Sequence, residues 1–422
     1  MKPLPSDVMS EIHNVYNHQL LDSAFMEIRE LLRDHHIFSQ ALSDDELRSF
    51  IEQEVLRRTS STLISTSEKL TLIDRLYYSF RGLDILQPLL EDASITEIMI
   101  NNEQQIFIER AGELSKLQLQ FENRERLESL IQQIVAPINR VVNEASPIVD
   151  ARLADGSRVS IVLPPIALRG PCVTIRKFPQ QPLTMDALLR IGAITEEAAA
   201  MLKVLVQAKY NIFISGGTGS GKTTFLNVLS SYIPRDERVI TIEDAAELQL
   251  REIDNMVALE TRNANSEGKG EISIRELIRA SLRMRPNRII VGEVRGHEAL
   301  DMLQAMNTGH EGSMSTGHAN NVRDMLSRLE MMILSGSELP LKVVRGQISA
   351  ALDIMIHLTR FSDRSRGIYE ISQVIGIDND DIQLQPLFQY DGDEQNTRQR
   401  LKRTSFPLYR TDKLKLAGLS LQ

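Results

Sequence analysis

The stretch from Gly216 to Thr223, which reads GGTGSGKT, constrains the fold of this chain more than any other segment. It matches the pattern G-x-x-x-x-G-K-[ST], in which glycines let backbone N–H groups turn inward around a phosphate. The apolar run NIFIS precedes it, and the run FLNVLSSYI, which has a helical pattern, follows it. We therefore predict an α/β domain with a mostly parallel sheet, in which a helix N-terminus directs its positive dipole end at the phosphate.

Each position of this loop has an expected role in binding ATP. Lys222 is expected to reach the β- and γ-phosphates, and Thr223 to ligate Mg²⁺. A glycine-rich turn without a ligand is the alternative, which the glycine spacing, the Lys-Thr pair and the strand–helix context together disfavour. The predicted nucleotide contacts of the loop are Gly216, Gly217, Thr218, Gly219, Ser220, Gly221, Lys222, Thr223 and Thr224.

Two further apolar runs end in carboxylates, as expected at the carboxyl edge of a parallel sheet. VITI is followed by Glu243, Asp244 and Glu247, for which a Mg²⁺ or water-positioning role fits, with helix capping by Asp244 as the alternative. RIIV is followed by Gly292 and Glu293 in the Walker B place, where Asp is commoner at the first position. We therefore assign Mg²⁺ to Glu243 and Asp244, and the attacking water to Glu293. The identity of the general base stays open, as does a surface strand-end role for Glu293.

The segment TGHEGSMSTGHAN contains His310 and His318, eight residues apart, in a predicted loop. This spacing is a poor zinc signature. We predict that the histidines donate hydrogen bonds to the γ-phosphate and report its loss, as switch loops do, against the alternative of structural histidines. Because hydrolysis accumulates negative charge on the transferred group, an arginine should assist it. The candidate arginines are Arg152, Arg158, Arg176 and Arg295, of which the first three could instead lie on a solvated surface.

Changes of pattern divide the chain into predicted domains. Residues 1–84 have helical spacing, with a capping box at Ser43 to Glu46, and form a helical bundle that is either a scaffold or a partner-binding module. Residues 85–178 form an α+β domain, with a turn at Asn101-Asn102, a helix at 124–135 and a hairpin at Asp155-Gly156. Residues 179–184 are a proline-stiffened linker, and 185–422 form the P-loop domain. The polar stretch 390–403 is predicted to be an exposed excursion.

Composition limits the partners and the compartment. The net charge of −9, the 5% of aromatic residues and the absence of Trp disfavour a surface dedicated to nucleic acid. One cysteine, Cys172, cannot form an intramolecular disulfide, and the start MKPLPSDVMS lacks the features of a signal peptide. No apolar run approaches the roughly 18 to 20 residues that span a bilayer. We expect a cytoplasmic protein with peripheral membrane contact.

The Walker A loop, ITIEDAAEL, VGEVRG and NTGHEGSMSTGHAN, in this order, resemble the secretion ATPases of the type II/type IV superfamily. The last phrase is most similar to the tight-adherence (Flp) pilus branch, of CpaF/TadA type. The resemblance extends over residues 85–390 through LLEDASITEIMINN, ARLADGSRVSI, VTIRKF and LDIMIHLTRFSDRSRGIYEISQVIGI. It implies that 243–247 is the family's Asp box, that His310 and His318 belong to its His box, and that Gly292-Glu293 is its own form of Walker B.

The resemblance also implies a RecA-like motor domain preceded by an α+β (PAS-like) domain and an N-terminal helical bundle. It implies a ring, usually a hexamer, that binds ATP between the α+β domain and the motor domain, with Arg158 and Arg176 approaching the phosphates. The implied partner is an integral membrane platform protein, on which the ATPase acts from the cytoplasmic face. Two other classes stay open: a nucleic-acid-dependent RecA-like motor of a conjugation system, and a nucleotide switch without turnover.

Overall fold

The computed structural model describes residues 21–32, 42–60, 64–110, 112–138, 142–178, 182–262, 264, 269–392 and 401–421. The described residues before position 179 and those after position 180 form two compact units. This division falls within the linker predicted at 179–184. Among the described residues, each hydrophobic core cluster belongs to one unit, and each unit contains two clusters.

The first unit combines helices with a six-stranded antiparallel sheet of order β3-β2-β1-β6-β5-β4. Its helical residues 21–32 pack with α3 and α4 around Phe25, Ile51 and Leu72. Its elements are α3 (Asp44–Arg58), α4 (Thr66–Arg81), η1 (Asp84–Leu86), α5 (Gln87–Glu91), β1 (Ile95–Asn102), β2 (Gln105–Arg110), β3 (Glu113–Lys116), α6 (Arg124–Val135), η2 (Ala136–Ile138), β4 (Ile148–Arg152), β5 (Arg158–Val162) and β6 (Cys172–Arg176).

Local sequence signals in this unit have mixed outcomes. The capping box at Ser43 and Glu46 is confirmed, since each side chain accepts from the backbone N–H of the other. The hairpin is confirmed as well, because Gly156 has φ 89° between β4 and β5. The turn predicted at Asn101-Asn102 is wrong by two residues: both belong to β1, and the Asn102 carboxamide instead accepts from the Gln104 N–H within the turn.

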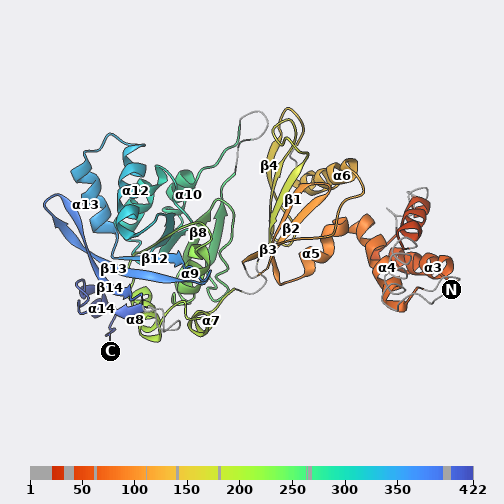
Figure 1. The fold of residues 1–422 in the computed structure, drawn as a ribbon. Coiled ribbons are helices and arrows are strands. Elements are labelled where there is room, and N and C mark those ends of the chain that lie inside the picture. The colour runs from red at the N-terminus through yellow and green to blue at the C-terminus, as the bar shows by residue number, and fades with distance from the viewer. Residues whose placement is uncertain are drawn as a thin grey trace. The chain divides into compact units, whose positions relative to one another are not determined.

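The second unit is built on a nine-stranded mixed sheet of order β15-β14-β13-β12-β7-β11-β10-β8-β9 (Figure 1). The strands from β12 to β9 in this order are parallel, whereas β13, β14 and β15 add on antiparallel. Its elements are α7 (Met185–Arg190), α8 (Glu196–Gln207), β7 (Ile212–Gly216), α9 (Lys222–Ser230), β8 (Val239–Glu243), β9 (Met256–Glu260), α10 (Ile274–Ser281), β10 (Arg288–Val291), α11 (Glu298–Asn307), β11 (Met314–His318), α12 (Val322–Leu334), α13 (Leu341–Ala351), β12 (Ile354–Arg360), β13 (Arg366–Asp378), β14 (Asp381–Tyr390), β15 (Leu401–Arg403) and α14 (Asp412–Leu416).

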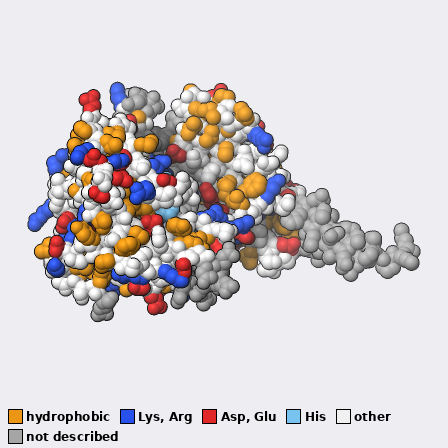
Figure 2. Space-filling view, turned by 60° about the vertical axis from the view of Figure 1, so that its left-hand side comes forward, with side chains coloured by type: hydrophobic (Ala, Val, Ile, Leu, Met, Phe, Trp, Pro, Cys, Tyr) orange, Lys and Arg blue, Asp and Glu red, His pale blue; other side chains and the backbone are white. Residues whose placement is uncertain are grey.

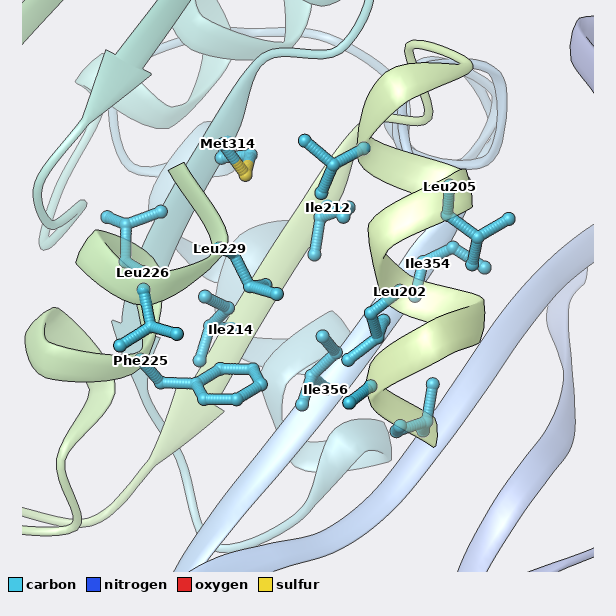
Figure 3. Packing of buried hydrophobic residues seen from close by; sticks show 14 of the residues in the cluster. Leu202, Leu205, Ile212, Ile214, Phe225, Leu226, Leu229, Met314, Ile354 and Ile356 are labelled. Carbon is cyan, nitrogen blue, oxygen red and sulfur yellow. The ribbon is translucent and has the colours of Figure 1, made fainter. Parts of the chain in front are cut away.

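Helices cover both faces of this sheet because its central strands are apolar on both sides. Ile212 and Ile214 of β7 belong to the core that includes α8 and α9, whereas Phe213 belongs to the core formed with α11, α12 and α13. Figure 3 shows the first of these faces, where the two isoleucines of β7 lie among Leu202 and Leu205 of α8 and the apolar side chains of α9. Strand β7 is therefore fixed from both sides, which holds the loop at its carboxyl end in place.

The excursion predicted for residues 390–403 is wrong at its end. Leu401–Arg403 form β15, which pairs with β14, and Leu401 is buried. Residues 393–400 lie outside the described part of the chain. No helix among the described residues has both the length and the apolar character needed to cross a membrane.

Candidate active site

The glycine-rich loop connects β7 to α9, so the strand–loop–helix context predicted for the motif is confirmed. Gly216 is sterically required, because an added Cβ would lie 2.5 Å from the Leu358 carbonyl oxygen and 2.5 Å from Ser220 Oγ. Gly221 has φ 93° and precedes α9 without a side-chain cap. The first N–H groups of α9 are therefore left for a ligand, and the helix dipole favours an anion there.

The loop residues differ in exposure. Gly217, Thr218 and Gly219 form the exposed crest, whereas Ser220 and Lys222 are buried. Thr223 is half-buried and Thr224 is exposed in the first turn of α9.

Lys222 and His318 are in direct contact. Lys222 Nζ donates to the Gly217 carbonyl oxygen at 3.0 Å and to His318 Nδ1 at 3.2 Å. Because an ammonium group can only donate, Nδ1 of the ring carries no proton. Burial, and secondly the charge of Lys222, lower the pKa of His318, which favours the neutral ring. Its proton is then on Nε2, which lies 3.0 Å from Glu293 Oε1.

Glu293 continues this chain of contacts toward the acidic loop. Its Oε2 accepts from Arg295 Nη2 at 2.9 Å, and Arg295 Nη1 lies 3.4 Å from Asp244 Oδ2. Its Oε1 is buried, and no donor in the described part of the chain makes an aligned hydrogen bond to it. The carboxyl ends of β7, β11, β10 and β8 thus bring together five residues that the sequence singled out, namely Lys222, His318, Glu293, Arg295 and Asp244.

Glu243 occupies the space beside Gly292. A Cβ added at Gly292 would lie 2.8 Å from Glu243 Cγ, because Ile242 of β8 pairs with Val291 of β10. Glu243 Oε1 accepts from the N–H groups of Glu247 and Leu248 at 3.0 and 3.2 Å. Burial raises the pKa of Glu243 to about 7. The buried carboxyl therefore organises the acidic loop, and its position explains why residue 292 has no side chain.

His310 lies at the opposite edge of the sheet from His318. His318 is the last residue of β11, so the prediction that it belongs to a loop is wrong. His310 precedes the other end of that strand, whose five residues span about 13 Å. Its Nδ1 is 3.2 Å from the Ala305 carbonyl oxygen. Within this chain the two histidines cannot meet one phosphate together, and the joint role predicted for them is not retained.

The predicted arginines of the first unit form one row across its sheet. Arg152 pairs with Arg158 across β4 and β5, and Arg158 pairs with Arg176 across β5 and β6. Glu97 of β1 pairs with Arg176 and extends the row. Sequence reasoning placed these residues on separate strands, and their alignment in one row comes from strand register.

The side-chain oxygen atoms at the carboxyl edge of the nine-stranded sheet suit an Mg²⁺ ion that binds together with a nucleotide. Among the described residues no group of three or more His, Cys, Asp or Glu side chains is placed to hold a metal ion. Mg²⁺ commonly takes one or two protein oxygens and completes its shell with phosphates and waters. Thr223 offers a half-buried hydroxyl and Asp244 an exposed carboxylate. Both are hard oxygen donors, as this ion prefers.

The sequence of this chain is similar to those of known secretion and conjugal-transfer proteins. The family model described as "Type II/IV secretion system protein" matches residues 80–403. A putative conjugal transfer protein of Mycobacterium tuberculosis is 36% identical over 318 residues, covering 74% of this chain and 89% of that protein. The type IV secretion system protein VirB11 of Brucella suis is 32% identical over 303 residues, covering 65% and 84%.

Among solved structures, the Yersinia pseudotuberculosis ATPase DotB superposes with a TM-score of 0.50 at 19% identity, covering 68% of this chain and 77% of that one. This likeness concerns the fold.

Proposed function

The chain belongs to the type II/IV secretion system protein family, and on that premise we propose that it is the ATP-driven motor of a tight-adherence (Tad/Flp) pilus or a related protein-secretion machine. It is a P-loop ATPase, as members of this family are. The phrase NTGHEGSMSTGHAN supports the CpaF/TadA-type branch. The proposed working form is a ring of six copies at the cytoplasmic face of the membrane, acting on an integral membrane platform protein.

The contact chain from Lys222 to Glu293 carries the proposal. The N–H groups of residues 217–223 and Lys222 bind the phosphates, and Thr223 with Asp244 would hold Mg²⁺, which neutralises phosphate charge. Glu293 Oε1, which is buried and has no aligned donor among the described residues, accepts a proton from water. The water oxygen bonds to the γ-phosphorus as the bond from phosphorus to the bridging oxygen breaks, and ADP leaves with that oxygen.

The neighbouring residues orient this base. His318 Nε2 lies 3.0 Å from Glu293 Oε1, and Arg295 holds Oε2. An incoming γ-phosphate competes with His318 for the Lys222 ammonium, so His318 is placed to register whether ATP is bound. Glu247 is the alternative base, and Arg158 and Arg176 are proposed to stabilise the transferred phosphoryl group.

Steady-state ATPase activity, measured beside light scattering for mass, tests the motor. Glu293→Gln should bind ATP but turn it over at least about 100-fold more slowly, because the amide cannot take the proton. Lys222→Ala should lose turnover and should also bind the nucleotide more weakly. Glu311→Gln, at the amino edge of the sheet, is the matched control and should behave as wild type. Normal turnover by Glu293→Gln would transfer the base role to Glu247.

A nucleic-acid-dependent conjugation motor is the second candidate, since a relative is described as a putative conjugal transfer protein. The net charge of −9 counts against it, and acidic and basic side chains are interspersed on the face shown in Figure 2. Single-stranded DNA added to the ATPase assay separates the two. A several-fold, salt-sensitive stimulation would favour the conjugation motor, and unchanged turnover would favour the secretion motor.

A further inference from the structure

Two arginines face each other at the end of the β12–β13 hairpin. Arg360 and Arg366 are direct cross-strand partners, and both are exposed. Neither guanidinium group donates a hydrogen bond to, or forms an ion pair with, any described residue. Like charges directly opposite each other on a sheet are destabilising. The pair therefore costs stability in the free protein, and an anion placed between the two guanidinium groups would remove that cost.

The pair lies beside the glycine-rich loop, on the face of the sheet that α9 covers. Leu358 and Ile368 pair across the same two strands, and both belong to the core that contains α9. Arg360 is two residues beyond Leu358 and so points to the same face. The Leu358 carbonyl oxygen abuts Gly216, and Arg366 Cδ lies 4.0 Å from the position of a Cβ on Gly221. The hairpin thus touches the loop near both of its ends.

The hairpin turn holds the two arginines in place. Asp363 Oδ1 accepts from both the N–H and the hydroxyl of Ser365, and the Phe361 N–H donates to the Ser365 carbonyl oxygen. The ring of Phe361 packs against Tyr390 with centroids 5.0 Å apart. A ligand that binds such a fixed hairpin orders little additional backbone, so each contact contributes more of its gross energy to affinity.

Strand order indicates which part of a nucleotide the arginines would meet. The sheet runs β13-β12-β7-β11-β10 in this region, so His318 and Glu293 lie on one side of the loop-bearing strand and the arginines on the other. The hydrolysed end of ATP belongs on the side of Glu293. We propose that Arg360 and Arg366 jointly bind the phosphates that are not transferred, the α- and β-phosphates, and so act on nucleotide affinity and not on the chemical step. This inference rests on the proposed ATP site.

The test compares Arg360→Ala, Arg366→Ala and the double variant with Arg364→Ala, a control in the same turn. Equilibrium dissociation constants for ATP and ADP are measured together with kcat and KM. Each single variant should weaken ATP and ADP alike by about tenfold, as expected for losing one charge-assisted phosphate contact, with kcat close to wild type. Arg364→Ala should bind both nucleotides normally. Without nucleotide, the melting temperature of Arg366→Ala should stay level or rise, because the repulsion is relieved.

Unchanged affinity for both nucleotides would overturn the inference. Loss of kcat with normal ADP binding would also overturn it, because the arginines would then act at the γ-phosphate. A smaller assembled mass with normal nucleotide binding would assign them to an acidic surface of a second copy. If the wild-type chain itself fails to bind ATP, the proposed function fails first, whereas normal wild-type binding with an insensitive Arg366→Ala refutes this inference alone.

Discussion

Gly292 is glycine for reasons of space. No positive φ requires it, but the Glu243 side chain occupies the volume that a Cβ would enter, with Cγ at 2.8 Å. Gly292→Ala should therefore lower the free energy of unfolding by about 1–3 kcal/mol in a denaturant titration. Gly346→Ala is the matched control, since no atom of the described residues lies within 4 Å of its Cβ position in α13, and it should be neutral or stabilising. Equal stability of the two variants would contradict the proposed packing.

The buried carboxyl of Glu243 should make stability depend on pH. Burial raises its pKa from 4.5 to about 7, so the folded chain binds more protons than the unfolded chain between these values. Titration of Glu243 does not change the free energy of unfolding below pH 4.5. As pH rises to 7 it lowers this free energy increasingly, by a few kcal/mol at most, which corresponds to a pKa shift on the order of two units. Glu243→Gln should therefore gain stability over wild type at pH 8 but not at pH 4.5. A constant difference across this range would exclude the buried titration.

At the scale of elements, motifs with local causes were predictable from sequence. The capping box at Ser43, the helix at 124–135 and the loop that opens α9 each depend on residues a few positions apart. The β12–β13 apposition of Arg360 with Arg366 depends on strand register, as does the contact of Glu243 with Gly292. The basic cluster TRFSDRSRG after an apolar run was a sequence signal for the apposition of the two arginines. Sequence alone did not show which strand pairs with which.

Misplaced predictions at this scale also have a physical cause. Small polar residues around His318 suggested a loop, but Met314–His318 is the buried strand β11, where Ser315 and Gly317 fit between neighbouring strands and helices. An added Cβ at Gly317 would lie 2.9 Å from Met325 of α12. Tertiary packing therefore overrode local composition, and it separated His318 from His310 by the length of a strand.

At the scale of the whole molecule, the two units have separate cores. The clusters around Ile98 and Phe25 belong to the first unit, and those around Ile214 and Phe213 to the second. A fragment spanning residues 182–422 should therefore fold cooperatively, because it retains both of its cores and the complete mixed sheet. It should also bind ATP, since the loop, α9 and the β12–β13 hairpin all lie within it.

The same fragment tests whether the first unit contributes to chemistry. We propose that Arg158 and Arg176, neighbours across β5 and β6, stabilise the transferred phosphoryl group. The fragment and the full-length Arg158→Ala/Arg176→Ala variant should then both bind ATP and both turn it over at least about tenfold more slowly than wild type, because the same charges are missing. Arg110→Ala, which removes a first-unit arginine paired with Asp92, is the control and should retain turnover. If the fragment folds, binds ATP and turns it over as fast as the full chain, hydrolysis needs nothing from the first unit, and the arginine row across its sheet must serve another purpose.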